Sequence, residues 1–120
     1  MQYLLLIYEN EQAFVGLSEE EQGKIFGEYM DYTNRIAKNG NYIAAEALQP
    51  VSSATTVRVK NGKTLTTDGP FAETKEQLGG FYLVEAKDLD EAIRLASGIP
   101  ASRNGAIEVR PIMPTPRPEV

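Results

Sequence analysis

The chain has 120 residues, a length typical of a single domain that buries one hydrophobic core. Its composition, 42% hydrophobic and 24% charged, is that of a soluble globular protein, and a net charge of −5 without clustered basic residues argues against nucleic acid as a partner. The absence of cysteine and histidine excludes disulfides, thiolate nucleophiles and cysteine-ligated zinc, and it leaves Asp, Glu, Lys and Tyr for any acid–base chemistry.

Residues 2–8 form a short apolar run of β-forming residues, which predicts the first strand. The polar residues that follow, up to Leu17, predict a loop. The start of the chain has no basic segment before this run and reaches acidic residues at once, so it reads neither as a signal peptide nor as a membrane span. We expect a cytoplasmic protein without a membrane partner.

Ser18 and Glu21 have the spacing of a capping box, in which each side chain bonds the other residue's backbone amide. A helix is therefore predicted over residues 19–38, with apolar positions repeating every three or four residues. Gly23 and Gly27 lie inside it, where glycine costs about 1 kcal/mol relative to alanine. Close packing of the helix on a sheet is the explanation we expect for them.

The middle of the chain is predicted to be a β-hairpin preceded by a strand. Residues 41–48 are a β-patterned run that stops before a Gln-Pro pair. Residues 55–60 and 63–67 are two further runs, separated only by Asn61 and Gly62. Asn-Gly is the residue pair favoured in a two-residue type I′ turn, so these two strands form a hairpin.

The last third of the chain repeats the strand, helix and strand pattern. Residues 81–86 and 106–113 are apolar strands, and Asp88 is placed to cap a helix between them. We therefore expect a folded domain over residues 1–113. The remaining residues, 114–120, are rich in proline and poor in apolar side chains, which predicts a loose tail unless a partner chain holds it.

The element order is βαβ, a hairpin, and βαβ again. This order predicts an α+β, ferredoxin-like antiparallel sheet with an inserted β-hairpin and both helices on one face. The strands at 2–8 and 81–86, however, are apolar on both sides. Two helices cover only one face of the sheet. The apolar surface of the other face therefore predicts either a homodimer that pairs sheet on sheet or a ligand cleft.

The connection from Asp68 to Gly80 allows two interpretations. Asp68, Gly69 and Pro70 have turn chemistry, and the Gly79-Gly80 pair permits a sharp start to the next strand, so the segment can be a plain connection. The connection is about a dozen residues long, whereas most connections have two to six, and connections of this length more often form part of a functional site.

The segment DGPFAETKEQLGGFYLVEA, residues 68–86, closely resembles the DGPF-type branch of the YCII-related proteins, as do the TTVRV and EVRPI strands on either side. The resemblance covers nearly the whole chain. It implies the dimeric α/β-barrel fold, in which ferredoxin-like subunits form a homodimer with a cleft near the sheet. It also implies a regulatory link, because members of the branch are often encoded beside alternative sigma factors.

The same resemblance gives the candidate site. Asp68 occupies the family's signature and is the candidate catalytic acid or base, with Phe71, Glu73 and Lys75 as binding residues beside it. If Asp68 is catalytic, Phe71 would provide an apolar wall beside its carboxylate, and Lys75 would place a positive charge near it. The YCII proteins proper resemble enzymes with a histidine–aspartate pair, and this chain has no histidine to complete one.

Three further residues are candidates for substrate binding. Tyr3 and Tyr82 could orient a polar substrate with their hydroxyls, although tyrosines on strands are commonly core residues, and Arg58 could hold a carboxylate or pair with Glu46. We expect no metal and no cofactor. Three functions remain open for this chain. The first is an isomerase- or lyase-like reaction on a small molecule, and the second is non-catalytic ligand binding or regulation linked to a sigma factor. In the third, the motif only stabilises a dimer.

Overall fold

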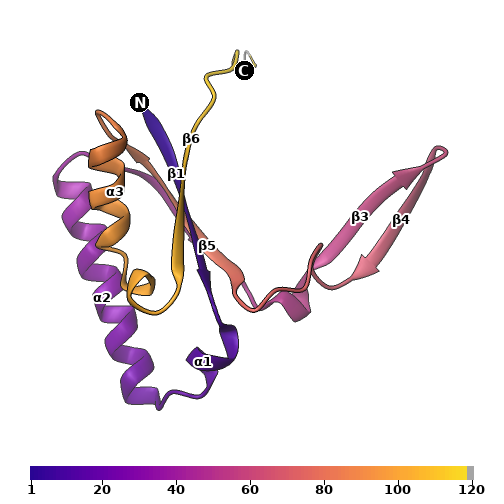
Figure 1. Ribbon diagram of the computed structural model, residues 1–120, viewed down its shortest axis with the longest axis horizontal. Coiled ribbons are helices and arrows are strands. Elements are labelled where there is room, and N and C mark those ends of the chain that lie inside the picture. Colours follow the sequence, from indigo (N-terminus) through magenta and orange to yellow (C-terminus); the bar gives the residue numbers. More distant parts are fainter. Residues whose placement is uncertain (119–120) are drawn as a thin grey trace.

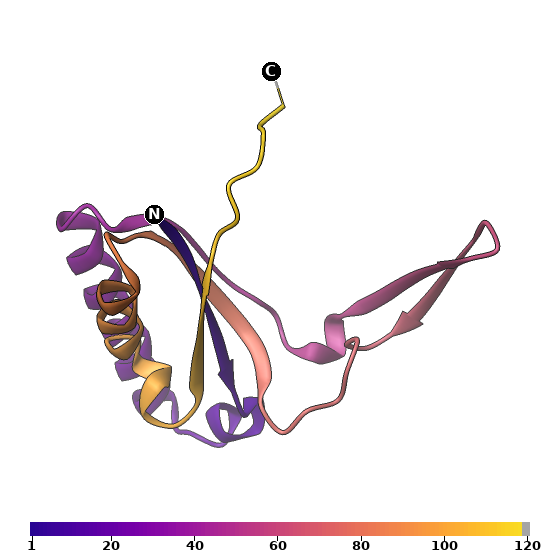
Figure 2. The same ribbon diagram turned by 45° about the horizontal axis from the view of Figure 1, so that its top comes forward.

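The computed structural model describes residues 1–118 and shows a sheet of four antiparallel strands with two helices against one of its faces (Figures 1 and 2). The strand order is β2-β5-β1-β6. A separate two-stranded sheet, β3-β4, projects from the domain. The elements are β1 Gln2–Glu9, α1 Glu11–Val15, α2 Glu19–Lys38, β2 Tyr42–Ala47, β3 Thr55–Lys60, β4 Lys63–Asp68, β5 Gln77–Glu85, α3 Leu89–Ser97 and β6 Ala106–Pro111, with single 3-10 turns at Val51–Ser53 and Pro100–Arg103. This arrangement confirms the predicted α+β, ferredoxin-like fold with an inserted hairpin.

Local signals in the sequence set several of these boundaries. The predicted capping box is present: the Glu21 amide donates to the Ser18 hydroxyl at 3.1 Å, and the Glu21 carboxylate accepts from the Ser18 amide at 3.2 Å. At the tip of the hairpin, Asn61 and Gly62 have φ of 51° and 75°, as a type I′ turn requires. Asp88 caps α3 by accepting from the Glu91 amide at 2.9 Å.

Several strand ends differ from the prediction by one or two residues, and two differences are larger. The segment expected to be a loop after β1 contains the short helix α1, which begins where the Asn10 side chain accepts from the Gln12 amide. β5 begins at Gln77 instead of residue 81, so Gly79 and Gly80 lie inside a strand. The connection after β4 is correspondingly shorter than the sequence suggested.

The glycines of β5 have a packing reason. A Cβ atom on Gly80 would lie 2.7 Å from the carbonyl oxygen of Glu46 in the neighbouring strand, so only glycine fits. Gly79 lies at a bulge, because the pairing of β5 with β1 shifts register between Ile7 and Tyr8. In α2 the expectation was wrong: a Cβ on Gly23 would meet nothing within 4 Å, so close packing does not explain that residue.

The core lies between the sheet and the two longer helices. Alternate residues of β1, namely Tyr3, Leu5 and Ile7, are buried against the helices, and Tyr82 and Val84 of β5 join them. Every second residue of a strand faces the same side, so this pattern assigns one face of the sheet to the core. Other buried members of the cluster come from the helices and the 3-10 turn, among them Tyr32, Ile36, Ala92, Ala96, Ile99 and Ala101.

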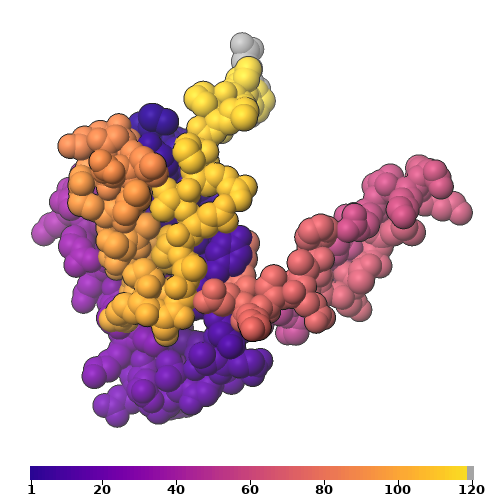
Figure 3. Space-filling view, viewed as in Figure 1, coloured from indigo at the N-terminus to yellow at the C-terminus, as the bar shows by residue number. Residues whose placement is uncertain are grey.

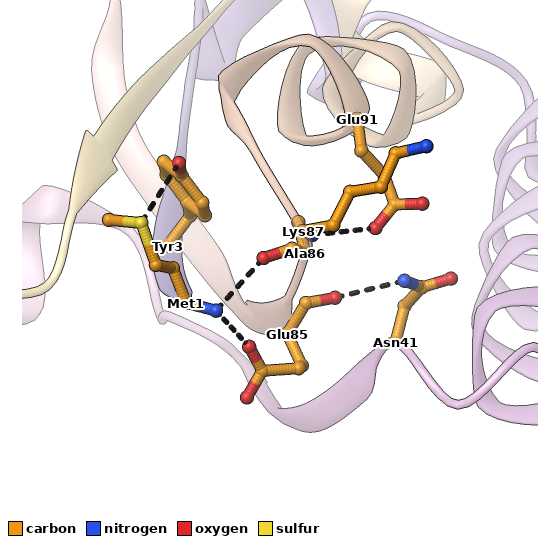
Figure 4. Close-up of polar contacts among 7 residues, drawn as sticks. All are labelled: Met1, Tyr3, Asn41, Glu85, Ala86, Lys87 and Glu91. Atoms are coloured by element: carbon orange, nitrogen blue, oxygen red, sulfur yellow. Dashed lines mark hydrogen bonds and ion pairs between the residues drawn. The ribbon is translucent and has the colours of Figure 1, made fainter.

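Figure 4 shows how the strand ends are fastened beside α3. The backbone nitrogen of Met1 donates to the carbonyl of Ala86 at 3.0 Å and also contacts the carboxylate of Glu85. The side-chain amide of Asn41 donates to the Glu85 carbonyl at 2.9 Å, and the Lys87 amide donates to Glu91 at 2.9 Å. These contacts join β1, β5 and the start of β2 at the end of the sheet that lies away from the hairpin.

We call the β3-β4 hairpin the arm. The space-filling view shows it standing apart from the rest of the domain (Figure 3). The radius of gyration is 16.6 Å, whereas a compact domain of this length would have about 14 Å. The arm contributes to the difference, since its two strands pair with each other and with no strand of the main sheet, and so does the C-terminal segment that extends from β6 (Figure 2).

Residues 114–118 contain no helix or strand and are exposed, and residues 119 and 120 of the predicted tail lie outside the described residues. None of the helices in residues 1–118 is long and apolar enough to cross a membrane. The cytoplasmic location stays a prediction.

Replacing Gly80 with alanine should destabilise the protein by about 1–3 kcal/mol, because the new methyl group would force β2 and β5 apart. Gly23→Ala is the matched control. It should stabilise the protein by up to about 1 kcal/mol, since the position is open and alanine favours helix. Urea unfolding of both variants measures the difference, and equal effects would contradict this explanation of Gly80.

Candidate functional site

A cavity of about 550 Å³ lies between the first two helices and the end of the sheet. Its walls are mainly apolar, and its size suits a small organic molecule. β1, α1, α2, β2 and β5 all contribute to it. The lining residues that matter most for its chemistry are Ile7, Glu9, Glu11, Phe14, Phe26, Tyr29, Ala45, Glu46, Leu48, Pro50, Gln77 and Tyr82.

α1 forms the outer wall of this pocket and is held in place from three directions. Its first amide, on Glu11, donates to the side-chain oxygen of Gln77 at 3.0 Å. The carboxylate of Glu11 accepts from the Val51 amide at 3.0 Å, and the Gln22 side chain donates to the Phe14 carbonyl at 3.1 Å. A helix of five residues is not stable by itself, so these contacts fix its position.

Two aromatic rings close the gap between α1 and α2. Phe14 and Phe26 meet edge to face, with their centroids 5.8 Å apart and their planes at 78°. This geometry is favourable for aromatic pairs. The pair keeps an apolar surface over the pocket, although Phe26 itself is exposed on its outer side.

The charged side chains that line the pocket are all acidic. Glu9 and Glu11 contribute carboxylates, and no lysine or arginine is among the lining residues. Glu46 borders the pocket with its backbone, because its pairing with Phe81 turns its side chain to the other face of the sheet. Burial raises the pKa of Glu9 above its usual value. Burial also raises the pKa of Tyr29, and the nearby charge of Glu9 adds to that shift, so the tyrosine stays neutral and can donate a hydrogen bond.

Tyr82 provides a second hydroxyl at the inner end of the pocket. It lies 2.7 Å from the hydroxyl of Thr33, and its ring packs against Tyr32 with the centroids 5.2 Å apart. Burial raises the pKa of Tyr82. The pocket therefore offers one carboxyl group with a raised pKa, two neutral phenols and apolar walls.

The structure separates the site residues that the sequence suggested. Tyr82 lines the pocket, whereas Tyr3 is buried in the core, where its hydroxyl lies 3.9 Å from the Met1 sulfur. Asp68 is exposed at the root of the arm, opposite Thr55 in the β3-β4 register. The other candidates, Phe71, Glu73 and Lys75, are exposed in the segment that follows.

Arg58 and Phe71 are brought together at the arm. The guanidinium carbon of Arg58 lies 5.2 Å from the centre of the Phe71 ring, a cation–π contact, although Phe71 remains 75% exposed. Arg58 therefore packs on the Phe71 ring and does not form the ion pair with Glu46 that the sequence suggested as an alternative. The predicted turn is also present, since Gly69 has φ of 108° and its carbonyl accepts from the Thr56 hydroxyl at 2.9 Å.

The connection that follows Asp68 ends at the pocket. Gln77, nine residues after Asp68, donates through its side chain to the Thr74 carbonyl at 2.6 Å and accepts from the amide of Glu11. It is the point where the segment joins the pocket wall. The signature residues thus lead from the arm to the rim of the pocket without lining it.

Sequence reasoning missed Glu9, Phe14, Phe26 and Tyr29. One signal for Glu9 was present: it continues the alternation of Tyr3, Leu5 and Ile7, which places a carboxylate on the buried face at the end of β1. Phe14 could not be found in the same way, because it needs the unexpected helix α1 to reach the pocket.

A sheet of four antiparallel strands, two helices on one face and an apolar pocket at one end define a small ferredoxin-like α+β protein with a candidate ligand site at the end of its sheet. The chain belongs to the YCII-related family, since the model of the YCII-related domain matches residues 1–116. It is also 36% identical, over 114 residues, to an uncharacterized protein of Rhizobium meliloti (strain 1021). That match covers 93% of this chain and 92% of the relative. Neither description states a reaction, so the function has to be argued from the site.

The raised pKa of Glu9 predicts a pH-dependent contribution to stability. The protonated form is favoured in the folded state, so the contribution is complete below the usual pKa of glutamate and is lost as the pH rises through the higher folded value. Glu9→Gln removes the ionisable group and with it this loss of stability at higher pH. The variant should become more stable than the wild type as the pH rises from about 4 to about 7.

Urea midpoints measured across this range test the prediction. Glu73→Gln, which removes an exposed carboxylate of the connecting segment, serves as the control and should leave the wild-type pH profile unchanged. A constant difference between the wild type and Glu9→Gln at every pH would show that Glu9 is not desolvated.

Proposed function

We propose that the protein binds a small, largely apolar molecule in the pocket between α1, α2 and the end of the sheet. The observation that carries this proposal is the pocket itself, an apolar cavity of about 550 Å³ with a few converging polar groups. Such a combination is the usual form of a ligand site. The family and its uncharacterized relative leave the ligand open.

The charges of the lining restrict the ligand. A carboxylate or phosphate entering the pocket would face Glu9 and Glu11 with no lysine or arginine in the lining, which is unfavourable at short range. A neutral molecule can accept a hydrogen bond from Tyr29, and a cationic one can pair with Glu9. The pocket therefore favours an apolar body with an alcohol, carbonyl or amine group.

A second candidate function is acid–base chemistry of an isomerase or lyase kind with Asp68 as the catalytic group. It is supported by the resemblance of the Asp68–Phe71 signature and by the path of the segment from Asp68 to the pocket rim at Gln77. Within one chain, Asp68 itself is exposed and outside the pocket, so Glu9 is the better placed acid or base. The regulatory link to a sigma factor stays a prediction.

A matched series of benzyl compounds tests the ligand class. Benzylamine and benzyl alcohol should bind and raise the melting temperature, whereas benzoate should bind at least about tenfold more weakly, or about 1.4 kcal/mol. Calorimetric titration gives the affinities. Ala45→Phe, which fills the pocket from β2, should abolish binding, and Met30→Ala, an exposed position on α2 outside the lining, should not affect it. Equal binding of benzoate would contradict the argument from charge.

The role of Asp68 is tested separately from the pocket. Asp68→Asn should leave the affinity for benzylamine unchanged, because Asp68 is not among the lining residues, while Glu9→Gln should weaken it roughly tenfold by removing the carboxylate that pairs with the amine. The same two variants distinguish the catalytic groups once turnover is found in a substrate panel. Loss of turnover in Asp68→Asn with intact binding would support the second candidate function.

A further inference from the structure

The helix α2 lies along the edge of the molecule opposite the arm (Figures 1 and 2). Gly23, Gly27 and Met30 follow one another at spacings of four and three residues, so they share one face of this helix. That face is opposite the buried residues Tyr32 and Ile36, which point into the core. We call it the outer face of α2.

The outer face carries large apolar side chains. Met30 is 67% exposed, and Phe26, one turn earlier at its border, is 61% exposed. Ala37, two turns after Met30, is also exposed. Apolar side chains that adjoin one another on a surface indicate an interface more often than isolated ones do.

The two glycines leave room for a second helix. A Cβ atom on Gly23 or Gly27 would meet nothing within 4 Å, so packing inside this chain requires neither glycine. Glycine is nonetheless unfavourable inside a helix. Next to Met30 the glycines lower the surface of the helix, and a side chain of another helix can fill a gap of this kind.

The charges at the two ends of α2 are opposite. Its first turn carries Glu19, Glu20 and Glu21, and its last turn carries Arg35 and Lys38. A second α2 in the antiparallel direction would place the acidic end of each helix beside the basic end of the other, whereas a parallel one would bring like charges together. Charge complementarity therefore selects the antiparallel direction.

We propose that a second copy of this chain packs antiparallel against the outer face of α2, with Met30 of each copy over Gly27 of the other and Glu19 of each copy near Lys38 of the other. In this register the two-fold axis passes midway between Gly27 and Met30. One contact then covers both outer faces, as a two-fold interface requires. The helix of an unrelated protein would have to supply the gap, the apolar side chain and the charges at matching positions, whereas a second copy has them by symmetry.

This contact is separate from the homodimer that the family resemblance implies. That homodimer would use the face of the sheet away from the helices, and it stays a prediction. A chain that made both contacts would form assemblies larger than a dimer. The proposed contact also uses neither Glu9 nor Tyr29 of the pocket, so it does not depend on the proposed ligand binding.

Analytical ultracentrifugation of the full chain at micromolar concentrations tests the proposal. Met30→Arg should weaken one association step at least about tenfold, because the new charge would be buried against the other copy. Ile93→Arg is the matched control, since Ile93 is an exposed apolar residue of the other long helix, α3, and it should associate as the wild type does. Equal assembly of the wild type and Met30→Arg, a monomeric wild type included, would overturn the proposal, and so would an equal loss in Ile93→Arg.

Cross-linking tests the register without a substitution at the centre of the contact. The chain contains no cysteine, so a single introduced cysteine reports one position. Tagged Glu19→Cys chains mixed with untagged Lys38→Cys chains should give a mixed dimer with a short bis-maleimide linker. Glu19→Cys chains alone should not, because the antiparallel register separates their two cysteines by roughly 28 Å along the helices.

Equal yields from the mixture and from Glu19→Cys chains alone would contradict the antiparallel register. A mixture that gives no mixed dimer would show that the outer face of α2 does not bind a second copy. An occupant other than a second copy would give this negative result with the purified chain, so it too would overturn the proposal.

Discussion

The alternation of side chains along β1 is the constraint on which the rest of the structure depends. Odd-numbered residues point toward the helices and even-numbered residues point away, and both sets are apolar between residues 3 and 8. One layer of two helices covers only the first set. The same strand therefore builds the core, supplies Ile7 and Glu9 to the pocket at its end, and leaves Leu4 and Leu6 on a surface that needs a different cover.

Much of the fold could be predicted because its signals are local. Ser18 and Glu21 start α2 with contacts that span three residues, and Asn61-Gly62 closes the hairpin because two adjacent residues adopt positive φ. The features that the sequence did not predict depend on contacts between residues that are distant in sequence. α1 exists because Gln77 and Val51 hold it, and Gly80 is needed because the backbone of Glu46 passes close by, so neither was visible in a short window.

The candidate site shows the same division. The segment from Asp68 to Lys75 is the most distinctive stretch of the sequence, yet its side chains are exposed at the root of the arm. The pocket instead gathers ordinary residues from five elements, and only Tyr82 among the predicted site residues belongs to it. A distinctive motif identified the family, whereas tertiary packing placed the apolar cavity. Glu9 could have been noticed from the alternation of β1, since a carboxylate on the core-facing side of a strand is uncommon.

The route of the chain through the pocket rim has a mechanical consequence. Leu48 and Pro50 line the rim on the way out to the arm, and Gln77 lines it on the way back, so both legs of the arm are anchored in the pocket wall. We expect a tilt of the arm to shift the rim, and a molecule that tightens the rim to restrain the arm. By thermodynamic reciprocity, a partner that binds the arm and a molecule that binds at the pocket rim would change each other's affinity by the same factor.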